Sequence, residues 1–297
     1  MVIVKLMGGL GNQLFQYAAA RRIALKHDTE VAFDMSWFQN TPPQDTHREF
    51  ELNHFNISAR IASPIEIAEI GGSCDSFLLK ALLRLGTITG LCRYHQYRFD
   101  ERELGYQTDL SDLNDNVYLH GYWQSELYFK DIEDTIRNDF SFKSAPFGSN
   151  LSLIKRLVSK ESVAIHFRRG DYDSNPLAAG YHGYPGHSYY YNAMKIISDM
   201  CMRPRFYVFS DDPEWVKREI VFPIDVEYVT HNLSKDSYED LRLMTNCKHV
   251  ILANSSFSWW GGWLGSNPDR IVIAPKRWFA GKPSSAADII PSRWISI

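Results

Sequence analysis

Two arginines directly follow a short apolar run near the middle of the chain, in the sequence HFRRGDY at 166–172. Guanidinium groups form bidentate hydrogen bonds with phosphate oxygens, so Arg168 and Arg169 are candidates for binding a phosphate-containing ligand. An ion pair between Arg169 and Asp171 at the end of the strand is the structural alternative. This ion pair explains the presence of one arginine as well as phosphate binding does, but it explains two adjacent arginines less well.

A second polar stretch, ANSSFSWWGG at 253–262, stands where a predicted strand ends and a helix begins. The first turn of a helix carries unpaired backbone N–H groups, which bind anions. Helix capping by serine and asparagine would also explain these residue types. The combination of this turn with Arg168 is more specific, and it predicts that a pyrophosphate is held between a cation and a helix dipole.

A third candidate, GGLGNQLF at 8–15, lies between a predicted strand and a predicted helix. Gly9 and Gly11 fit the start of a dinucleotide-binding fingerprint, but Leu14 stands where that fingerprint has glycine or alanine. Asp34 follows at a separation that suits a ribose contact, which leaves a dehydrogenase as a minor alternative. We interpret the stretch as a phosphate loop of a different kind.

Two adjacent aspartates, Asp211 and Asp212, invite a metal-binding interpretation. They stand directly before Pro213, at the start of a predicted helix, where acidic residues are stabilising without any metal. We favour helix capping. The ten histidines include no H-x-x-x-H pair, and the four cysteines form no C-x-x-C pair and fit reduced thiols in a cytosolic protein. We therefore expect no metal and no other cofactor.

Alternation of strands and helices places these residues. Apolar, β-branched strands of this kind are typical of a parallel sheet that is covered on both faces, so the fold class is α/β. A linker-like stretch at 141–150 separates two Rossmann-like halves, 1–150 and 151–297, and ligands bind such sheets at the carboxyl ends of the strands. Strands are expected at 2–6, 31–34, 117–120, 163–165, 206–209, 250–252 and 271–273, and helices at 10–27, 77–85, 125–140, 188–202, 213–219, 238–247 and 257–264.

Composition limits the classes of partner. The chain has 297 residues, 44% of them hydrophobic, and a net charge of −3, which excludes a broad basic surface for nucleic acid. Aromatic residues make up 14% of the chain, which suits packing of a core and also contact with sugar rings. We find no signal peptide and no run of 18 apolar residues. We expect a cytoplasmic protein without an integral membrane segment, and this leaves peripheral contact with the inner face of the membrane open.

The three motifs HFRRGDY, NSSFSWWGGWL and GGLGNQLFQYA together resemble bacterial α-1,2-fucosyltransferases of glycosyltransferase family 11. The resemblance covers essentially the whole chain. It implies a GT-B-like fold, in which two Rossmann-like domains face a central cleft, with GDP-β-L-fucose bound by 151–297 and the acceptor on the side of 1–150. It also implies inversion at the anomeric carbon, no metal, and an oligosaccharide or glycolipid acceptor that ends in galactose.

The resemblance assigns roles to individual residues of the second half. It places Arg168 on the β-phosphate of the donor and His166 beside the nucleotide. Ser255, Ser256 and Phe257 form the turn that faces the phosphates.

Further donor contacts follow from looser matches. In YEDL, Asp240 resembles the acid that accepts the guanine N1–H and N2–H in related α-1,6-fucosyltransferases, although a surface position on a helix explains it equally well. Arg169 is a further donor-binding candidate. Gly11 and Asn12 would face the donor across the cleft, with Asn12 directed at phosphate or fucose.

The reaction itself requires two kinds of group. Cleavage of the fucose–phosphate bond leaves negative charge on the β-phosphate, which Arg168 and the helix N–H groups would stabilise. The attacking hydroxyl is helped by a general base, for which Asp171 and Glu126 are candidates. Each has a structural alternative, because Asp171 can pair with Arg169 and Glu126 can cap a helix.

Two rival functions share parts of this pattern. An α-1,6- or protein-O-type fucosyltransferase on the same scaffold would keep Arg168 and differ in acceptor and linkage. A non-catalytic glycan-binding protein would use its tryptophans and would need neither Arg168 nor the turn at 255–257.

Overall fold

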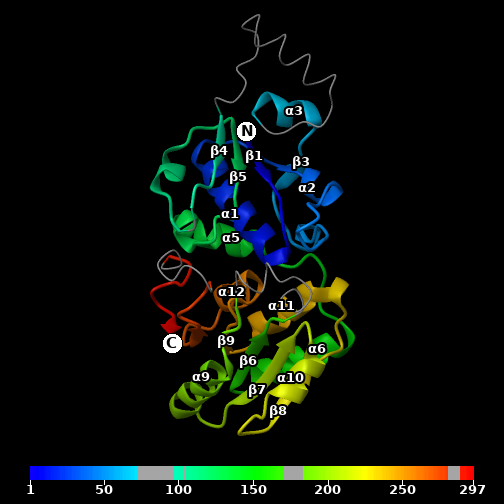
Figure 1. Cartoon of the computed structure of the whole chain (residues 1–297), viewed down its shortest axis with the longest axis vertical. Helices are drawn as coiled ribbons and strands as arrows, with labels where there is room; N and C mark the ends of the chain where they lie inside the picture. Colours follow the sequence, from blue (N-terminus) through cyan, green and yellow to red (C-terminus); the bar gives the residue numbers. More distant parts are fainter. Residues whose placement is uncertain (72–96, 104, 170–182, 280–287) are drawn as a thin grey trace, which may run out of the picture. The chain divides into compact units, whose positions relative to one another are not determined.

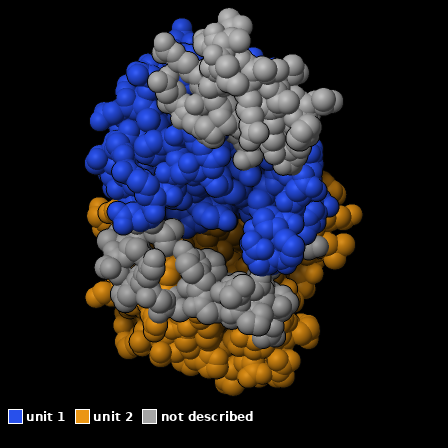
Figure 2. Space-filling model, turned by 45° about the horizontal axis from the view of Figure 1, so that its top comes forward, with its two compact units in different colours: residues 1–143 blue, residues 144–297 orange. Residues whose placement is uncertain are grey.

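The computed structural model describes residues 1–71, 97–103, 105–169, 183–279 and 288–297 (Figure 1). The chain divides into two compact units, Met1–Lys143 and Ser144–Ile297, which are coloured separately in Figure 2. The division falls inside the linker-like stretch that the sequence marks at 141–150. Each unit is built around its own parallel sheet.

The sheet of the first unit has five strands in the order β3-β2-β1-β5-β4, all paired in parallel. Its strands are β1 Val2–Lys5, β2 Val31–Asp34, β3 Ala59–Ile61, β4 Arg98–Asp100 and β5 Val117–His120. The long helix α1 (Leu10–Lys26) packs against β1 and β2. Shorter helical segments connect the strands: α2 Ser36–Gln39, η1 Leu52–His54, α3 Pro64–Glu69, η2 Thr108–Asp112, η3 Glu126–Tyr128, η4 Lys130–Ile132 and α5 Glu133–Asp139.

The sheet of the second unit has six parallel strands in the order β11-β10-β9-β6-β7-β8. Its strands are β6 Ser162–Phe167, β7 Arg205–Ser210, β8 Val226–Val229, β9 His249–Ile251, β10 Val272–Ala274 and β11 Ile295–Ser296. Its helical segments are α6 Gly148–Ser159, α9 His187–Met200, α10 Pro213–Glu219, η5 Ser234–Asp236, α11 Ser237–Asn246 and α12 Ser256–Trp263. All six residues of β6 are buried, as expected for a central strand that is covered on both faces. The predicted α/β class with two Rossmann-like units is confirmed.

Glycine and tryptophan of the SFSWWGGW helix have structural roles. A Cβ atom on Gly261 would lie 2.9 Å from Met244 Cε, and one on Gly262 would lie 3.0 Å from Val272 Cγ1. The glycines therefore let α12 pack closely on α11 and β10. All eight tryptophans of the chain are at most 8% exposed: Trp37, Trp123, Trp215, Trp259, Trp260, Trp263, Trp278 and Trp294. They build the cores of the two units and present no open ring to a sugar.

One sequence prediction about elements is wrong. The helix expected at 125–140 is divided into η3, η4 and α5, although Ser125 does act as an N-cap and accepts a hydrogen bond from the Leu127 N–H at 3.3 Å. The linker-like stretch contains the start of α6 at Gly148. The sequence also gave no indication of the short strands β3, β4, β8 and β11. The helix expected at 77–85 lies outside the described residues.

Candidate functional site

The polar residues that follow β6, β7 and β9 meet at one edge of the second sheet. These strands are neighbours in the order β9-β6-β7 and run in parallel, so their carboxyl ends share an edge (Figure 1). Arg168 follows β6, Asp211 follows β7, and Ser255 follows β9 and begins α12. The edge therefore combines a cation, a carboxylate and a helix start.

The Asp211 carboxylate contacts both Arg168 and Arg169. Its Oδ2 accepts a hydrogen bond from Arg168 Nη1 at 2.8 Å, and the two side chains are 23% and 25% exposed. Its Oδ1 accepts a hydrogen bond from the Arg169 backbone N–H at 2.8 Å. The capping interpretation is thus correct only for Asp212, whose Oδ1 accepts a hydrogen bond from the Trp215 N–H at 3.0 Å. Asp211 instead orients the Arg168 guanidinium at the sheet edge.

Arg169 has a different environment. Its guanidinium lies over the indole ring of Trp215 at 4.3 Å, a cation–π contact with α10. The pairing predicted between Arg169 and Asp171 cannot be compared, because Asp171 lies outside the described residues. The role of Asp171 as a general base remains a prediction for the same reason.

His166 lies on β6 and is 4% exposed. Its ring is 5.6 Å from the ring of Phe257, which brings the HFRRGDY and NSSFSWW motifs into contact. Burial is the main cause that lowers the pKa of His166 to about 4; the charge of Asp211 opposes this shift and the charge of Arg168 adds to it. The imidazole is therefore neutral near pH 7. Within the described part of the chain, its Nδ1 has no hydrogen-bond partner, which is unusual for a buried polar atom.

The turn at the start of α12 contains one buried residue, followed by half-buried ones. Asn254 donates to the carbonyl oxygens of Gly183 and Trp278 at 3.0 and 3.1 Å, so its side chain supports the fold. Ser255 is the N-cap residue, yet among the described residues its side chain makes no capping hydrogen bond. Ser256 and Phe257 are half-buried. The anion-binding role of this turn stays a prediction.

Asp240 lies near the start of α11 and is half-buried, so the surface interpretation does not describe it fully. Its Oδ1 accepts a hydrogen bond from Asn232 Nδ2 at 2.7 Å. The pKa of Asp240 is raised to about 7, chiefly by burial, with the hydrogen bond from Asn232 opposing the rise and the charges of Glu239 and Asp236 contributing to it. A carboxylate that titrates near neutrality is typical of a functional site.

The GGLGNQ turn of the first unit lies at the carboxyl end of β1. Gly8 has a φ of +74°, and a Cβ atom there would lie 2.6 Å from Asn12 Nδ2. Asn12 Oδ1 accepts a hydrogen bond from Gln124 Nε2 at 2.8 Å, which fixes the Asn12 side chain. Gly11 is buried in the first turn of α1.

Two glutamines that the sequence analysis did not single out anchor this turn, and both are fully buried. Gln13 bonds the backbone of Gly8 and of the segment at 49–51, at 2.8–2.9 Å. Gln16 accepts from the Met7 N–H at 3.0 Å and donates to the Gly121 carbonyl at 3.1 Å. A glutamine on the buried face of a predicted helix was the available signal, because a buried amide must find partners.

The structure argues against the dehydrogenase alternative, because Asp34 is not available for a ribose contact. Asp34 is fully buried, accepts hydrogen bonds from the Ser36 N–H at 2.8 Å and the Tyr118 hydroxyl at 2.6 Å, and is thus a structural residue. Glu126 is only 4% exposed within η3, which disfavours it as a base for an incoming hydroxyl.

One cluster in the described residues has the composition of a metal site. Glu161, Cys201 and His249 offer ligand atoms within 4.8 Å of one another. His249 Nδ1 accepts the Ile271 N–H at 3.0 Å, so Nε2 carries the proton of the neutral ring and donates it to Glu161 Oε1 at 2.7 Å. A metal at Nε2 would have to displace this proton while Nδ1 stays an acceptor. The hydrogen bonds favour a structural cluster over a metal centre.

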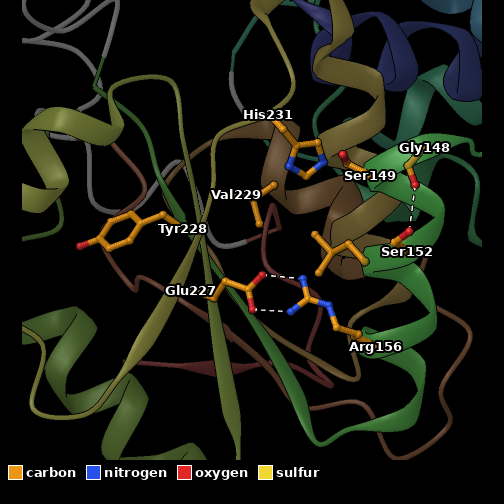
Figure 3. Close-up of a pocket in the computed structure, with 9 residues that line it drawn as sticks. Gly148, Ser149, Ser152, Arg156, Glu227, Tyr228, Val229 and His231 are labelled. Atoms are coloured by element: carbon orange, nitrogen blue, oxygen red, sulfur yellow. Dashed lines mark hydrogen bonds and ion pairs between the residues drawn. The ribbon is translucent and has the colours of Figure 1, made fainter.

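A groove of about 570 Å³ lies between α6 and β8 (Figure 3). Arg156 and Glu227 cross it with two hydrogen bonds of 2.8 and 2.6 Å. None of the residues predicted for the site lines it. Its lining residues are Gly148, Ser149, Ser152, Leu153, Arg156, Glu227, Tyr228, Val229 and His231.

Comparison with known proteins adds independent information. The family described as Glycosyl transferase family 11 matches residues 95–297. An α-1,2-colitosyltransferase of Escherichia coli is 32% identical over 100% of this chain and 99% of its own length. The O-antigen biosynthesis glycosyltransferase WbnK of Escherichia coli is 33% identical over 98% of this chain and 99% of its own length. The galactoside α-(1,2)-fucosyltransferase 1 of Lagothrix lagotricha is 27% identical over 56% of this chain and 48% of its own length.

Proposed function

Since the chain belongs to glycosyl transferase family 11 and is a glycosyltransferase, we propose that it transfers L-fucose from GDP-β-L-fucose to the 2-hydroxyl of a galactose-terminated glycan. The transfer inverts the anomeric carbon and forms an α-1,2 linkage. We assign the donor to the unit 144–297 and the acceptor to the unit 1–143.

The observation that carries the proposal is the sheet edge at Arg168. Its guanidinium is oriented by Asp211, close to the start of α12 and to His166, whose Nδ1 has no hydrogen-bond partner among the described residues. In the reaction, Arg168 and the N–H groups at Ser255, Ser256 and Phe257 stabilise the negative charge that develops on the leaving β-phosphate. His166, neutral and buried, pairs with a polar group of the nucleotide. This chemistry needs no metal, and we propose that none takes part.

The remaining roles complete the donor and acceptor sites. Asp240 accepts the N–H groups of the guanine edge, for which a carboxylate is suited. Arg169, Gly11 and Asn12 contribute further donor contacts. Asp171 is the better of the two proposed bases, because Glu126 is shielded from solvent.

The transferred sugar has one specific alternative. A relative that matches over its full length is named for colitose, which is fucose without its 3-hydroxyl group. A parallel assay with GDP-fucose and GDP-colitose decides between them, since a binding site that hydrogen-bonds the 3-hydroxyl discriminates strongly against the deoxy sugar. Fucose as the preferred substrate is the expected result.

A membrane association would be peripheral under this proposal. No helix in the described part of the chain is both long and apolar enough to cross a bilayer. The acceptor is an oligosaccharide or a glycolipid, and we place the reaction in the cytoplasm or at the inner face of the membrane.

The decisive experiment screens galactose-terminated acceptors with the purified protein and GDP-fucose and determines the product linkage. We expect an α-1,2-linked fucose. An α-1,6-linked or peptide-linked product would replace the proposal by its rival on the same scaffold. A protein that binds glycans but shows no affinity for GDP in calorimetry would refute the enzyme activity proposed for it.

A further inference from the structure

Two asparagines from distant parts of the second unit form a reciprocal amide pair. Asn150, in the first turn of α6, donates from Nδ2 to Asn232 Oδ1 at 2.9 Å. Asn232, which follows β8, donates back from Nδ2 to Asn150 Oδ1 at 3.2 Å. Asn150 is 7% exposed, so the pair is largely shielded from water. Figure 3 shows His231, the neighbour of Asn232, close to the start of α6.

The asparagine pair is hydrogen-bonded to Asp240. The second hydrogen of Asn232 Nδ2 is donated to Asp240 Oδ1 at 2.7 Å, and His231 Nε2 lies 2.7 Å from Asn150 Oδ1. An ionised carboxylate only accepts, so Asn232 must present its NH₂ group to Asp240, and this fixes the orientation of both amides. Asn150 Oδ1 then faces the His231 N–H. The Asn232 donor at the end of this series of hydrogen bonds therefore favours the ionised form of Asp240.

We propose that Asn232, braced by Asn150, is a positioning residue that holds the Asp240 carboxylate ionised and in place for recognition of the guanine base. The inference rests on the proposed function. Asn232 occupies one lone pair of Oδ1, and Oδ2 has no hydrogen bond within the described residues. The second lone pair of Oδ1 and both of Oδ2 are thus available to the N1–H and N2–H groups of guanine.

The surroundings of Asp240 make this support necessary. Burial, opposed by the Asn232 hydrogen bond and reinforced by the charges of Glu239 and Asp236, raises its pKa to about 7 in total. Glu239 is itself paired with Arg242 at 2.9 Å. Among the described elements that pack against α11, helix α12 carries no titratable side chain, the 3₁₀ segment η5 carries Lys235 and Asp236, and helix α6 carries two. These are Lys155 and Arg156, of which Arg156 pairs with Glu227.

The protonation state of Asp240 makes GDP binding depend on pH. The ionised carboxylate binds guanine, so GDP binding weakens as the pH falls through the pKa of Asp240. Removal of the Asn232 donor destabilises the ionised form, which moves this transition to higher pH. A hydrogen bond to a charged group is worth enough to shift the midpoint by about one pH unit.

The test measures GDP and IDP dissociation constants by calorimetry between pH 5.5 and 8.5, for the wild type, Asn232→Ala and Asn150→Ala. Asn267→Ala is the matched control, since the Asn267 side chain bonds the Lys248 carbonyl and the Asp269 N–H and takes no part in the Asn150–Asn232–Asp240 hydrogen bonds. Phosphate ionisation affects all variants alike, so the readout is the difference between variants. Thermal melting verifies that each variant is folded.

We expect the midpoint to rise by about one pH unit in Asn232→Ala, by less in Asn150→Ala and not at all in Asn267→Ala. The preference of the wild type for GDP over IDP, which lacks the N2 amino group, should fall about tenfold in Asn232→Ala at pH 6.5. Identical pH midpoints of GDP binding in the wild type and in Asn232→Ala would overturn the positioning role, even if the wild type binds GDP. A wild type that binds no GDP at pH 8.5 would instead refute the proposed function.

Discussion

Arg168 and Arg169 are adjacent in sequence but are held by different kinds of contact. Arg168 is oriented by the carboxylate of Asp211, whereas Arg169 stacks on Trp215 and is fixed through its backbone N–H. Under the proposed function, the ion pair orients a guanidinium for the donor phosphate, and the stacking anchors the arginine segment on α10. The two arginines should therefore contribute differently to catalysis and to stability.

Substitution of Arg168 tests the leaving-group role. We expect Arg168→Lys to fail almost as badly as Arg168→Ala, because an ammonium cannot reproduce the bidentate fork. Loss of one preorganised contact of this kind costs about 3–4 kcal/mol, or turnover lower by a factor on the order of 100 to 1,000. Turnover of GDP-fucose and the melting temperature are measured for both, with exposed Arg218→Ala as the control.

Arg169→Ala should lower the melting temperature as well as the turnover, because it removes the stacking on Trp215. A near-normal turnover of Arg168→Ala would contradict the mechanism. Equal losses of stability in the two alanine variants would contradict the division of roles between the arginines.

The paired aspartates allow a second test at the same scale. Asp211→Asn weakens the contact that orients Arg168 and should lower kcat with little loss of stability. Asp212→Ala removes the cap of α10 and should destabilise the protein by about 1 kcal/mol while kcat is retained. Steady-state kinetics and chemical denaturation of both variants check this. The reverse pattern would contradict the roles assigned to the two aspartates.

At the scale of elements, the sequence indicates strand ends more reliably than the partners that meet there. The position of Arg168 follows from β6 alone, because a buried strand must end before a charged pair. Its partner Asp211 lies on β7, and only the parallel register brings the two strands together. The same holds for Asn150 and Asn232, which are 82 residues apart. Tertiary pairing of polar groups is not encoded in any local pattern.

Short elements explain the other differences. Strands β3, β4 and β11 contain two or three residues each, too few for a periodic signal, and β8 mixes valine with glutamate. The segment at 125–140 has helical composition throughout, but η3 and η4 precede α5. A serine cap and acidic residues favour a helix start, and they do not determine whether the first turns are α-helical or 3₁₀.

The GGLGNQ turn yields a prediction for an element. Gly8→Ala must accept a left-handed backbone and a contact of 2.6 Å with the Asn12 side chain. We expect Gly8→Ala to destabilise the protein by more than the cost of the left-handed backbone alone, which is about 1–2 kcal/mol. Displacement of the Asn12 side chain should also lower kcat/KM. Gly148→Ala is the matched control, since Gly148 also has a positive φ, of +55°, but no atom within 4 Å of its Cβ position. Equal losses in both variants would mean that the Asn12 contact has no effect.

At the scale of the whole molecule, the proposed chemistry rests on fixed protein charges. Asp211 is committed to Arg168, and the Glu161–His249 cluster to its own hydrogen bonds. We expect turnover to survive excess EDTA, measured with GDP-fucose and the best acceptor of the screen. A loss of turnover that magnesium or manganese restores would show that a metal takes part, and Asp211 would then be the first ligand to test.

The burial of all eight tryptophans determines what an optical measurement can report. Because the indoles are shielded, native emission should be blue-shifted and should change strongly on unfolding, which makes fluorescence a sensitive monitor of both cores. A glycan acceptor has no exposed indole to contact, so its addition should leave the spectrum unchanged. Trp215 is the exception, since it lies beneath the Arg169 guanidinium, and GDP that draws this arginine away would alter the emission of that one indole.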